Sequence, residues 1–231
     1  MYRRLDTGLA YWRWDLVFQD VSGAQRQSID SLFNECRGSL LPFLFLDPFQ
    51  NLVRHSEAFE AAAWEKEASI VATAEQADPF DMPRARRLSN ASGAWGSVRQ
   101  RLPVPAWVTY SVSCWLRANV PTGVEILAGP AGGTNGTSAM VNTVWMRHSL
   151  TVTHISNEEE LDVGLRIPGN SEVYAYGFQL EPFATVSEYQ KTTEESGVHV
   201  NCRFEQDEIR WVTKGVDHHS TRIYLRAPRI S

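Results

Sequence analysis

The chain of 231 residues has no long apolar run, and its first residues, Met1 to Asp6, lack the apolar stretch of a secretion signal. A membrane-spanning helix needs about 20 mostly apolar residues. We therefore expect no membrane span and no secretion through a cleaved signal.

Cysteine is also scarce, with three residues that lie far apart and in no CxxC spacing: Cys36, Cys114 and Cys202. An odd number of isolated cysteines indicates neither a zinc site nor a disulfide framework. The pattern favours free, buried thiols, which suit a protein made in a reducing compartment.

Positive charge is in short supply, because the net charge is −5 and no cluster of lysine and arginine offsets it. Proteins that bind nucleic acid usually concentrate positive charge to neutralise phosphates. The composition therefore argues against nucleic-acid binding.

Signatures of catalysis are missing too. The sequence contains no HExxH, no GxSxG and no Rossmann or phosphate-loop spacing, and residues 129–136 read as a long hairpin turn. His218-His219 is a possible metal pair but fits a solvated charged turn better, and Asp78 with Asp81 supplies too few ligands for calcium. The acidic run 158–160 with Asp162 fits a polar strand edge better than an acid/base pair. We expect no enzyme activity, cofactor or metal, with an unrecognised glycosidase, which needs two facing carboxylates, as the open alternative.

Apolar and charged contents of 43% and 21% are those of an ordinary globular protein, and the length allows one large domain or two small ones. The sequence pattern changes at residues 43–52, from a strand-helix-strand pattern to short alternating strands. Pro48 cannot donate to a strand ladder, and Asp47 can close a turn there. We expect one small domain, interrupted just after Asp47-Pro48 by a second, against the alternative of one large sandwich with an ordinary loop.

The first fifty residues combine a strand, a helix and a second strand. Residues 10–18 alternate, with Trp12, Trp14, Leu16 and Phe18 on one face. Residues 25–36 have helical spacing, with Ser22 as the N-terminal cap and Gly38 at C′. Residues 40–46 form a mostly apolar strand.

Short strands separated by Gly, Pro, Ser and Asn follow, at the spacing of a β-sandwich. They cover residues 69–74, 86–90, 97–102, 108–117, 123–128, 138–142, 144–153, 161–167 and 172–181. Residues 57–64 form one helical turn or a loop, with Phe59, Ala63 and Trp64 facing inward.

The tail adds three strands, at 197–204, 208–212 and 221–225, with a charged turn around 217–219. Neither end of the chain is long enough to bury a core alone. The predicted fold is mainly β: a small β-barrel or sheet with one helix, made by residues 1–50 and 193–231, interrupted by a jelly-roll β-sandwich at 51–192.

The candidate binding residues are the polar and aromatic side chains expected on the outer faces of the strands. In residues 110–117, Ser113, Trp115 and Arg117 share the face opposite the apolar residues. In residues 173–181, alternation puts Tyr174, Tyr176, Phe178 and Leu180 in the core and Gln179 outside. Trp95 lies in the loop 92–96. Exposed aromatics can stack on sugar rings, whereas the structural alternative has each of these residues covering an edge or pairing with a neighbour.

The interrupting region resembles carbohydrate-binding jelly-roll modules found on phage tail proteins. The matching residues are 51–52, 56–59, 63–64, 110–117, 145–147, 173–181 and 187–189. The resemblance implies a β-sandwich that binds glycans.

The flanks look like the distal tail protein of long-tailed phages and gene transfer agents, through residues 12–18, the helix ending at Gly38, 42–48, 203–204, 207–209 and 223–225. That resemblance implies a belt domain in a homohexameric ring, with the tail tube and tail-tip hub or fibre proteins as partners. It also implies host cell-surface polysaccharide as a ligand, assembly in the host cytoplasm and a final place at the virion tail tip. The strands that usually follow the Asp-Pro pair are absent here. The alternatives are a free-standing lectin or adhesin and, less favoured, a polysaccharide-degrading enzyme.

Overall fold

The structure is a computed structural model that describes residues 2–6, 11–130, 132, 136–155 and 159–229. It is mainly β with one helix, which confirms the predicted fold class. The chain divides into two compact units, one of residues up to 45 together with those from 199, and one of residues 46–198. We call them the end unit and the sandwich unit. Within the described residues, no helix is long and apolar enough to span a membrane.

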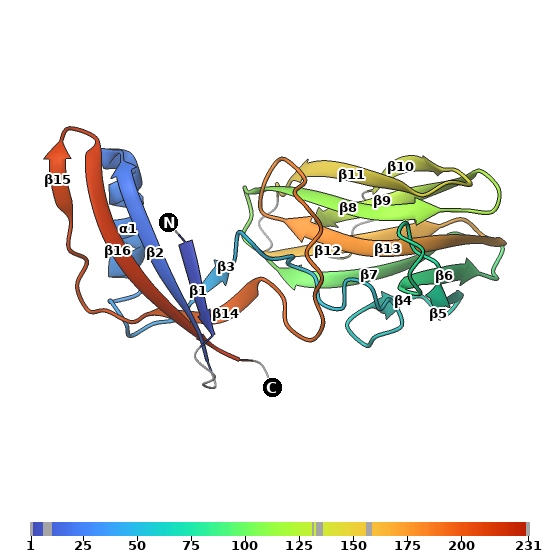
Figure 1. Cartoon of the computed structure of the whole chain (residues 1–231), viewed down its shortest axis with the longest axis horizontal. Coiled ribbons are helices and arrows are strands. Elements are labelled where there is room, and N and C mark those ends of the chain that lie inside the picture. Colours follow the sequence, from blue (N-terminus) through green and yellow to red (C-terminus); the bar gives the residue numbers. More distant parts are fainter. Residues whose placement is uncertain (1, 7–10, 131, 133–135, 156–158, 230–231) are drawn as a thin grey trace. The chain divides into compact units, whose positions relative to one another are not determined.

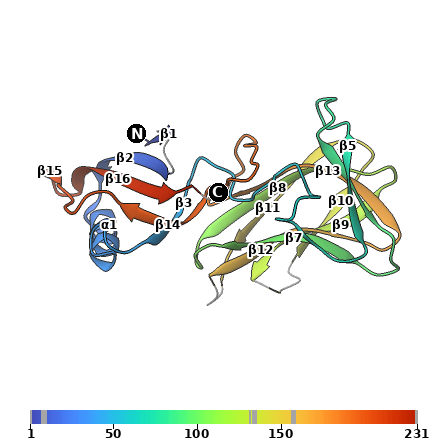
Figure 2. The ribbon, with the colours of Figure 1, turned by 90° about the horizontal axis from the view of Figure 1, so that it is seen from below.

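The end unit is a six-stranded antiparallel sheet with a helix on one face (Figures 1 and 2). Its strand order is β1-β2-β16-β14-β3, and β15 pairs with β16. The elements are β1 (Tyr2–Asp6), β2 (Tyr11–Val21), α1 (Gly23–Glu35), β3 (Phe43–Leu46), β14 (Val198–Phe204), β15 (Val212–Gly215) and β16 (His218–Pro228).

Alternation along β2 builds the core of this unit. Trp12 and Trp14 are buried, and Leu16 and Phe18 pack beside them, as the sequence predicts. Ile29 and Phe33 of α1, with the C-cap residue Cys36, complete the core. Leu32, placed on the apolar side of the helix by its spacing, is instead 40% exposed.

Both ends of α1 follow from local chemistry. Ser22 caps the helix as predicted: its hydroxyl accepts from the Gln25 N–H at 3.2 Å, and the Gln25 side chain accepts from the Ser22 N–H at 2.9 Å. At the C-terminal end the cap is Cys36, so the C′ position belongs to Arg37 with φ 53°, and Gly38, which was predicted at C′, lies one residue further on with φ 65°.

The expected strand at 208–212 is wrong, because residues 208–211 form no strand and β15 begins at Val212. The Trp211 indole donates to Asp30 of α1 at 2.8 Å, and Arg26 lies over the same ring. This anchoring to the helix replaces pairing in the sheet.

The sequence placed His218 and His219 in a charged turn, but both residues belong to β16, which begins at His218.

The sandwich unit has two five-stranded antiparallel sheets, of order β10-β9-β12-β7-β4 and β11-β8-β13-β6-β5 (Figure 1). The strands are β4 (Glu65–Lys66), β5 (Ile70–Gln76), β6 (Ala85–Asn90), β7 (Gly96–Pro103), β8 (Thr109–Arg117), β9 (Thr122–Pro130), β10 (Gly136–Val141), β11 (Met146–Thr153), β12 (Glu160–Ile167) and β13 (Ser171–Glu181). All nine predicted strands of this region are present, and among the described strands the sequence missed the two-residue β4.

Side chains from both sheets form one core. Residues 57–64 form turns, and Phe59 and Trp64 are buried against Phe178, with ring centres 4.7 Å apart for Phe59–Trp64 and 5.2 Å for Trp64–Phe178. Ala63 is half-exposed. Of the expected turn at 129–136, residues 131 and 133–135 lie outside the described residues, and so do residues 156–158 with Glu158 of the acidic run.

The three cysteines are buried free thiols, as predicted. Burial raises the pKa of Cys114 and of Cys202 to about 12. Neither thiol is a nucleophile at neutral pH.

Candidate functional site

A β-bulge in β13 decides which side chains reach the outer face of the sheet β11-β8-β13-β6-β5. The pairing of β13 with β8 shifts between Tyr176 and Gln179, where Gly177 has φ 64°. An extra residue in one strand reverses the alternation beyond it. Tyr174 and Tyr176 therefore do not join the core with Phe178, as the uninterrupted alternation predicts.

Cross-strand pairing arranges the outer face in rows. One row is Arg87–Tyr174–Arg117, and the next is Tyr176–Trp115–Arg147. Further rows are Gln179–Ser113–Ser149 and Glu181–Ser111–Thr151. We call the side chains of the first two rows, with Trp145, the aromatic–arginine face.

The arginines of this face lie over its aromatic rings. The guanidinium carbon of Arg147 is 4.4 Å from the centre of the Trp115 ring. That of Arg117 is 4.4 Å from the centre of the Tyr174 ring and 5.6 Å from that of Trp145. Arginine over an indole or phenol ring is a favourable cation–π arrangement. The two Trp-x-Arg segments, on β8 and at the start of β11, thus form a checkerboard of two tryptophans and two arginines.

All four side chains of the checkerboard are half-exposed. Among the described residues, no carboxylate forms an ion pair with Arg117 or Arg147, and the Nε atom of each is buried without a hydrogen-bond partner. Arg147 donates only to neutral oxygens, the Ser187 carbonyl at 2.7 Å and the Ser113 hydroxyl at 2.9 Å. Burial lowers the pKa of Arg147 from its ordinary value. The checkerboard therefore carries positive charge with no direct counter-ion.

At the ends of the face, the other arginines do have carboxylate partners. Arg87 lies 3.6 Å from a Glu172 carboxylate oxygen, and Arg84 lies 2.5 Å from Asp78. Arg84 also covers the Tyr176 ring, which leaves Tyr176 buried. On this face, and within the part of the chain that the structure describes, the arginines without a carboxylate partner are Arg117 and Arg147.

The segment 182–192 covers the two rows Gln179–Ser113–Ser149 and Glu181–Ser111–Thr151. The Ser111 and Thr151 hydroxyls donate to the carbonyls of Thr185 and Ala184, at 3.2 and 3.0 Å. The Gln179 amide donates to the Glu188 carbonyl at 3.2 Å and accepts from the Gln190 N–H at 2.7 Å. Half of the outer face is therefore closed by the chain itself.

The predicted site residues are not all brought together. Trp115 and Arg117 lie side by side and half-exposed, whereas Ser113 and Gln179 are fully buried beneath Arg147 and the segment 182–192. The expectation that Ser113 and Gln179 face a ligand is corrected, because their polar groups already bond to the chain. Trp95 is 40% exposed and lies in the loop just before β7 of the other sheet, where the Arg166 guanidinium carbon is 5.5 Å from the centre of its ring.

Sequence reasoning missed Trp145, Arg147 and Tyr174 as members of this face. A signal for the first two was present, because Trp145-Met146-Arg147 repeats the spacing of Trp115-Leu116-Arg117. In antiparallel neighbouring strands, two such segments place each arginine beside the other segment's tryptophan. No local signal indicated Tyr174, because the bulge reverses its side.

The outer face of the second sheet has arginines of a different kind. Asp162 accepts from Arg101 at 2.8 and 3.0 Å and from the Gly132 N–H at 2.8 Å. Arg166 donates to Glu125 at 3.1 Å. Burial works against ionisation of Asp162, but the bonds from Arg101 and Gly132 prevail and lower its pKa. These arginines are matched by carboxylates.

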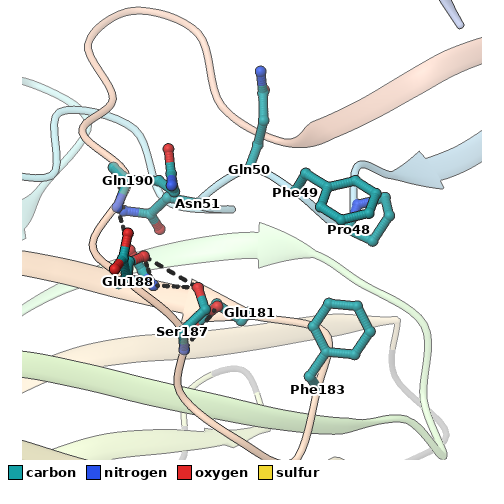
Figure 3. A pocket seen from close by; sticks show the side chains of 10 residues that line it. Pro48, Phe49, Gln50, Asn51, Glu181, Phe183, Ser187, Glu188 and Gln190 are labelled. Atoms are coloured by element: carbon teal, nitrogen blue, oxygen red, sulfur yellow. Dashed lines mark hydrogen bonds between the residues drawn. The ribbon is translucent and has the colours of Figure 1, made fainter. Parts of the chain in front are cut away.

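A pocket of about 390 Å³ lies elsewhere in the sandwich unit (Figure 3). Its apolar lining includes Phe49 and Phe183, which are 63% and 45% exposed. Part of its polar lining is bonded within the chain: both carboxylate oxygens of Glu181 accept from the Ser187 N–H, and the Asn51 amide donates to the Phe178 and Gln190 carbonyls. Among the described residues, the side chains of Gln50 and Glu188 in this lining make no hydrogen bond or ion pair. The pocket offers apolar surface but few free polar groups.

No cluster of three or more metal-ligating side chains occurs in the described part of the chain. Asp78 accepts from the Phe80 and Met82 N–H groups and from Arg84, so its oxygens are already occupied. His219 shares a hydrogen bond of 2.9 Å with Thr213. In the described residues, neither of the two metal sites considered from the sequence, at Asp78 with Asp81 and at His218 with His219, has three or more ligating side chains.

No family model matches the chain, and no curated protein matches it. Similar solved structures include the CBM22-1 xylan-binding domain from Paenibacillus barcinonensis Xyn10C, at 12% identity over 63% of this chain and 98% of that one, with a TM-score of 0.45. A second is TmCBM61 in complex with beta-1,4-galactotriose, at 14% identity over 58% and 99%, with a TM-score of 0.44. A third is the enzymatically active domain of bacteriophage CBA120 tailspike protein 4, at 11% identity over 59% of this chain and 22% of that one, with a TM-score of 0.46. Carbohydrate-binding modules are thus among the structural neighbours, at a likeness too low to carry an argument about what this chain binds.

Proposed function

We propose that the protein binds polysaccharide through the aromatic–arginine face of the sandwich unit and performs no catalysis there. The observation that supports this is the checkerboard of Trp115, Arg117, Trp145 and Arg147, which is half-exposed. Tryptophan offers a flat apolar surface to a sugar ring, and arginine offers planar donors to its oxygens. A shallow face of this kind binds weakly per copy, and several copies on one assembly raise the effective concentration about 10² to 10⁴ fold.

The test is a glycan array with the intact protein and the Trp115→Ala variant. We expect the variant to bind at least about fivefold more weakly, since one stacked ring contributes about 1 kcal/mol or more. Trp95→Ala is the matched control, because it removes an arginine-covered tryptophan from the loop just before β7 of the opposite sheet. Loss of binding in Trp95→Ala alone would move the site to the other face, and an intact protein that binds no glycan would overturn the proposal.

The wider role that we propose is a phage tail-tip component. In this role, copies of the end unit form a homohexameric ring that contacts the tail tube and hub or fibre proteins, and the sandwich unit binds host surface polysaccharide. The virion assembles in the host cytoplasm. The support is the resemblance of the flanking sequences to distal tail proteins, together with an end unit built from both ends of the chain.

Native mass spectrometry of the protein, alone and with a tail-tube protein, tests this role. A ring is the expected product, and a monomer that ignores the tube would contradict it. The competing proposal, a free-standing lectin or adhesin, predicts that joining residue 45 to residue 199 leaves no foldable domain. The tail proposal expects a small β protein from the same deletion, which circular dichroism and thermal melting would detect.

A further inference from the structure

We propose that the preferred ligand of the aromatic–arginine face is an acidic glycan, whose carboxylate or sulfate group binds between Arg117 and Arg147 while a sugar ring rests on Trp115 or Trp145. This inference depends on the proposed glycan binding and adds the ligand class. It follows from the distribution of carboxylates over the two outer faces of the sandwich.

The first step is the missing counter-ion. In the described residues, neither Arg117 nor Arg147 has a carboxylate within ion-pair distance, although the whole chain is acidic with a net charge of −5. On the opposite face Arg101 and Arg166 each have one, at 2.8 and 3.1 Å. A positive patch that persists on an acidic protein favours approach of an anion.

The second step is that the fold already holds both guanidinium groups in place. The Arg117 guanidinium is stacked on Tyr174, and Arg147 is fixed by its bonds to Ser187 and Ser113. Because the Nε of each arginine is buried, the donors left for a ligand are Nη hydrogens, of which Arg147 directs one at Ser187 and one at Ser113. A planar guanidinium held in this way presents its remaining Nη N–H groups to the oxygens of a carboxylate or a sulfate. Little side-chain freedom is then lost on binding.

The third step concerns the other charged groups that face the patch. Glu172 is shared by Arg87 and by the Asn119 amide, and Glu181 is buried and accepts from the Ser187 N–H. Asp78 is occupied by Arg84. Glu181 also acts on Arg147 from beyond ion-pair distance and works to raise the pKa of Arg147. In the described residues no carboxylate contacts Arg117 or Arg147 directly, so the checkerboard remains open to an external anion.

The experiment is isothermal titration of the intact protein with pairs of oligosaccharides that share one backbone. A galacturonate tetrasaccharide is compared with its carboxyl-reduced form, and a sulfated glucan oligosaccharide with its unsulfated form. We expect at least one of the two acidic forms to bind at least about tenfold more tightly than its neutral partner. Raising the salt from about 0.05 to 0.5 M should weaken only the acidic ligands, because exposed charge pairs are screened. The two pairs distinguish a carboxylate from a sulfate.

Arg117→Gln should remove the preference for the acidic form, so that the acidic and neutral members of each pair bind with affinities within about twofold of each other, because Gln lacks the charged fork. Arg166→Gln is the matched control, since it also removes an arginine that stacks on a tryptophan. Arg117→Lys, which keeps the charge, serves if Arg117→Gln fails to fold. Equal binding of acidic and neutral forms would overturn this inference and leave the glycan-binding proposal standing. Failure of the protein to bind any of the four oligosaccharides or any arrayed glycan would overturn both.

Discussion

The two outer faces of the sandwich carry the same kinds of side chain in opposite states. Both have arginines that cover tryptophans, Arg117 and Arg147 on one face and Arg166 on the other. In the described residues only Arg166 of these three has a carboxylate partner, Glu125, and on the same face Asp162 pairs with Arg101. An arginine that pairs with a carboxylate of the same chain stabilises the folded structure, whereas an arginine without such a partner is available to bind a ligand.

The largest stability effect that we predict comes from the bulge that creates the aromatic–arginine face. Gly177→Ala should lower the free energy of unfolding by about 2–3 kcal/mol, because a left-handed backbone costs a side-chain-bearing residue about 1–2 kcal/mol. The added Cβ would also lie 3.2 Å from the rings of Trp115 and Tyr189. Urea denaturation measures the change. Gly123→Ala is the control, since no atom lies within 4 Å of the methyl group that it would add, and equal stability of both variants would contradict the strain argument.

A smaller effect on stability should follow from removing the Asp162 carboxylate, which lies on the face where arginines pair with carboxylates. Asp162→Asn should lower the free energy of unfolding by about 1–2 kcal/mol at pH 7, because Arg101 and the Gly132 N–H lose a charged acceptor. The expected cost is modest because Arg101 is partly exposed.

The pH dependence of that variant gives a second readout. The pKa of Asp162 is lowered in the folded protein, so its stabilisation is present above the ordinary carboxyl pKa of about 3.9 and is lost as the pH falls through the lower folded value. The difference between the original protein and Asp162→Asn should shrink between about pH 5 and pH 2. A difference that stays constant over this range would mean that the carboxylate charge is not what stabilises the sheet.

The smallest predicted effect on stability should distinguish Arg117 from Arg166. Arg166→Gln should cost about 0.5–1 kcal/mol and become less costly in high salt, because it removes an ion pair with Glu125. Arg117→Gln should change stability by less than about 0.5 kcal/mol, because the loss of its ring contacts is offset by removal of an Nε atom buried without a partner. Denaturation at two salt concentrations measures both. A larger cost for Arg117→Gln than for Arg166→Gln would assign Arg117 to the fold and not to a ligand.

Features that depend on near neighbours in the chain could be predicted from the amino-acid sequence. Alternation indicated the buried side of β2 and the strands of the sandwich, because successive side chains of a strand point to opposite faces. The capping pair of Ser22 and Gln25 defined the start of α1 for the same local reason. Trp115 and Arg117 could be selected as partly exposed outer-face residues from their own strand alone.

Features that depend on contacts between distant segments could not be predicted in this way and emerge in the folded chain. The bulge at Gly177 moved Tyr174 and Tyr176 out of the core, and Trp211 drew residues 208–211 to α1 in place of a strand. The segment 182–192 buried Ser113 and Gln179, which alternation alone had left exposed. Whether an arginine keeps a free charge is a question of the same kind, because its carboxylate partner is set by which strand lies beside it and not by the residues next to it in the chain.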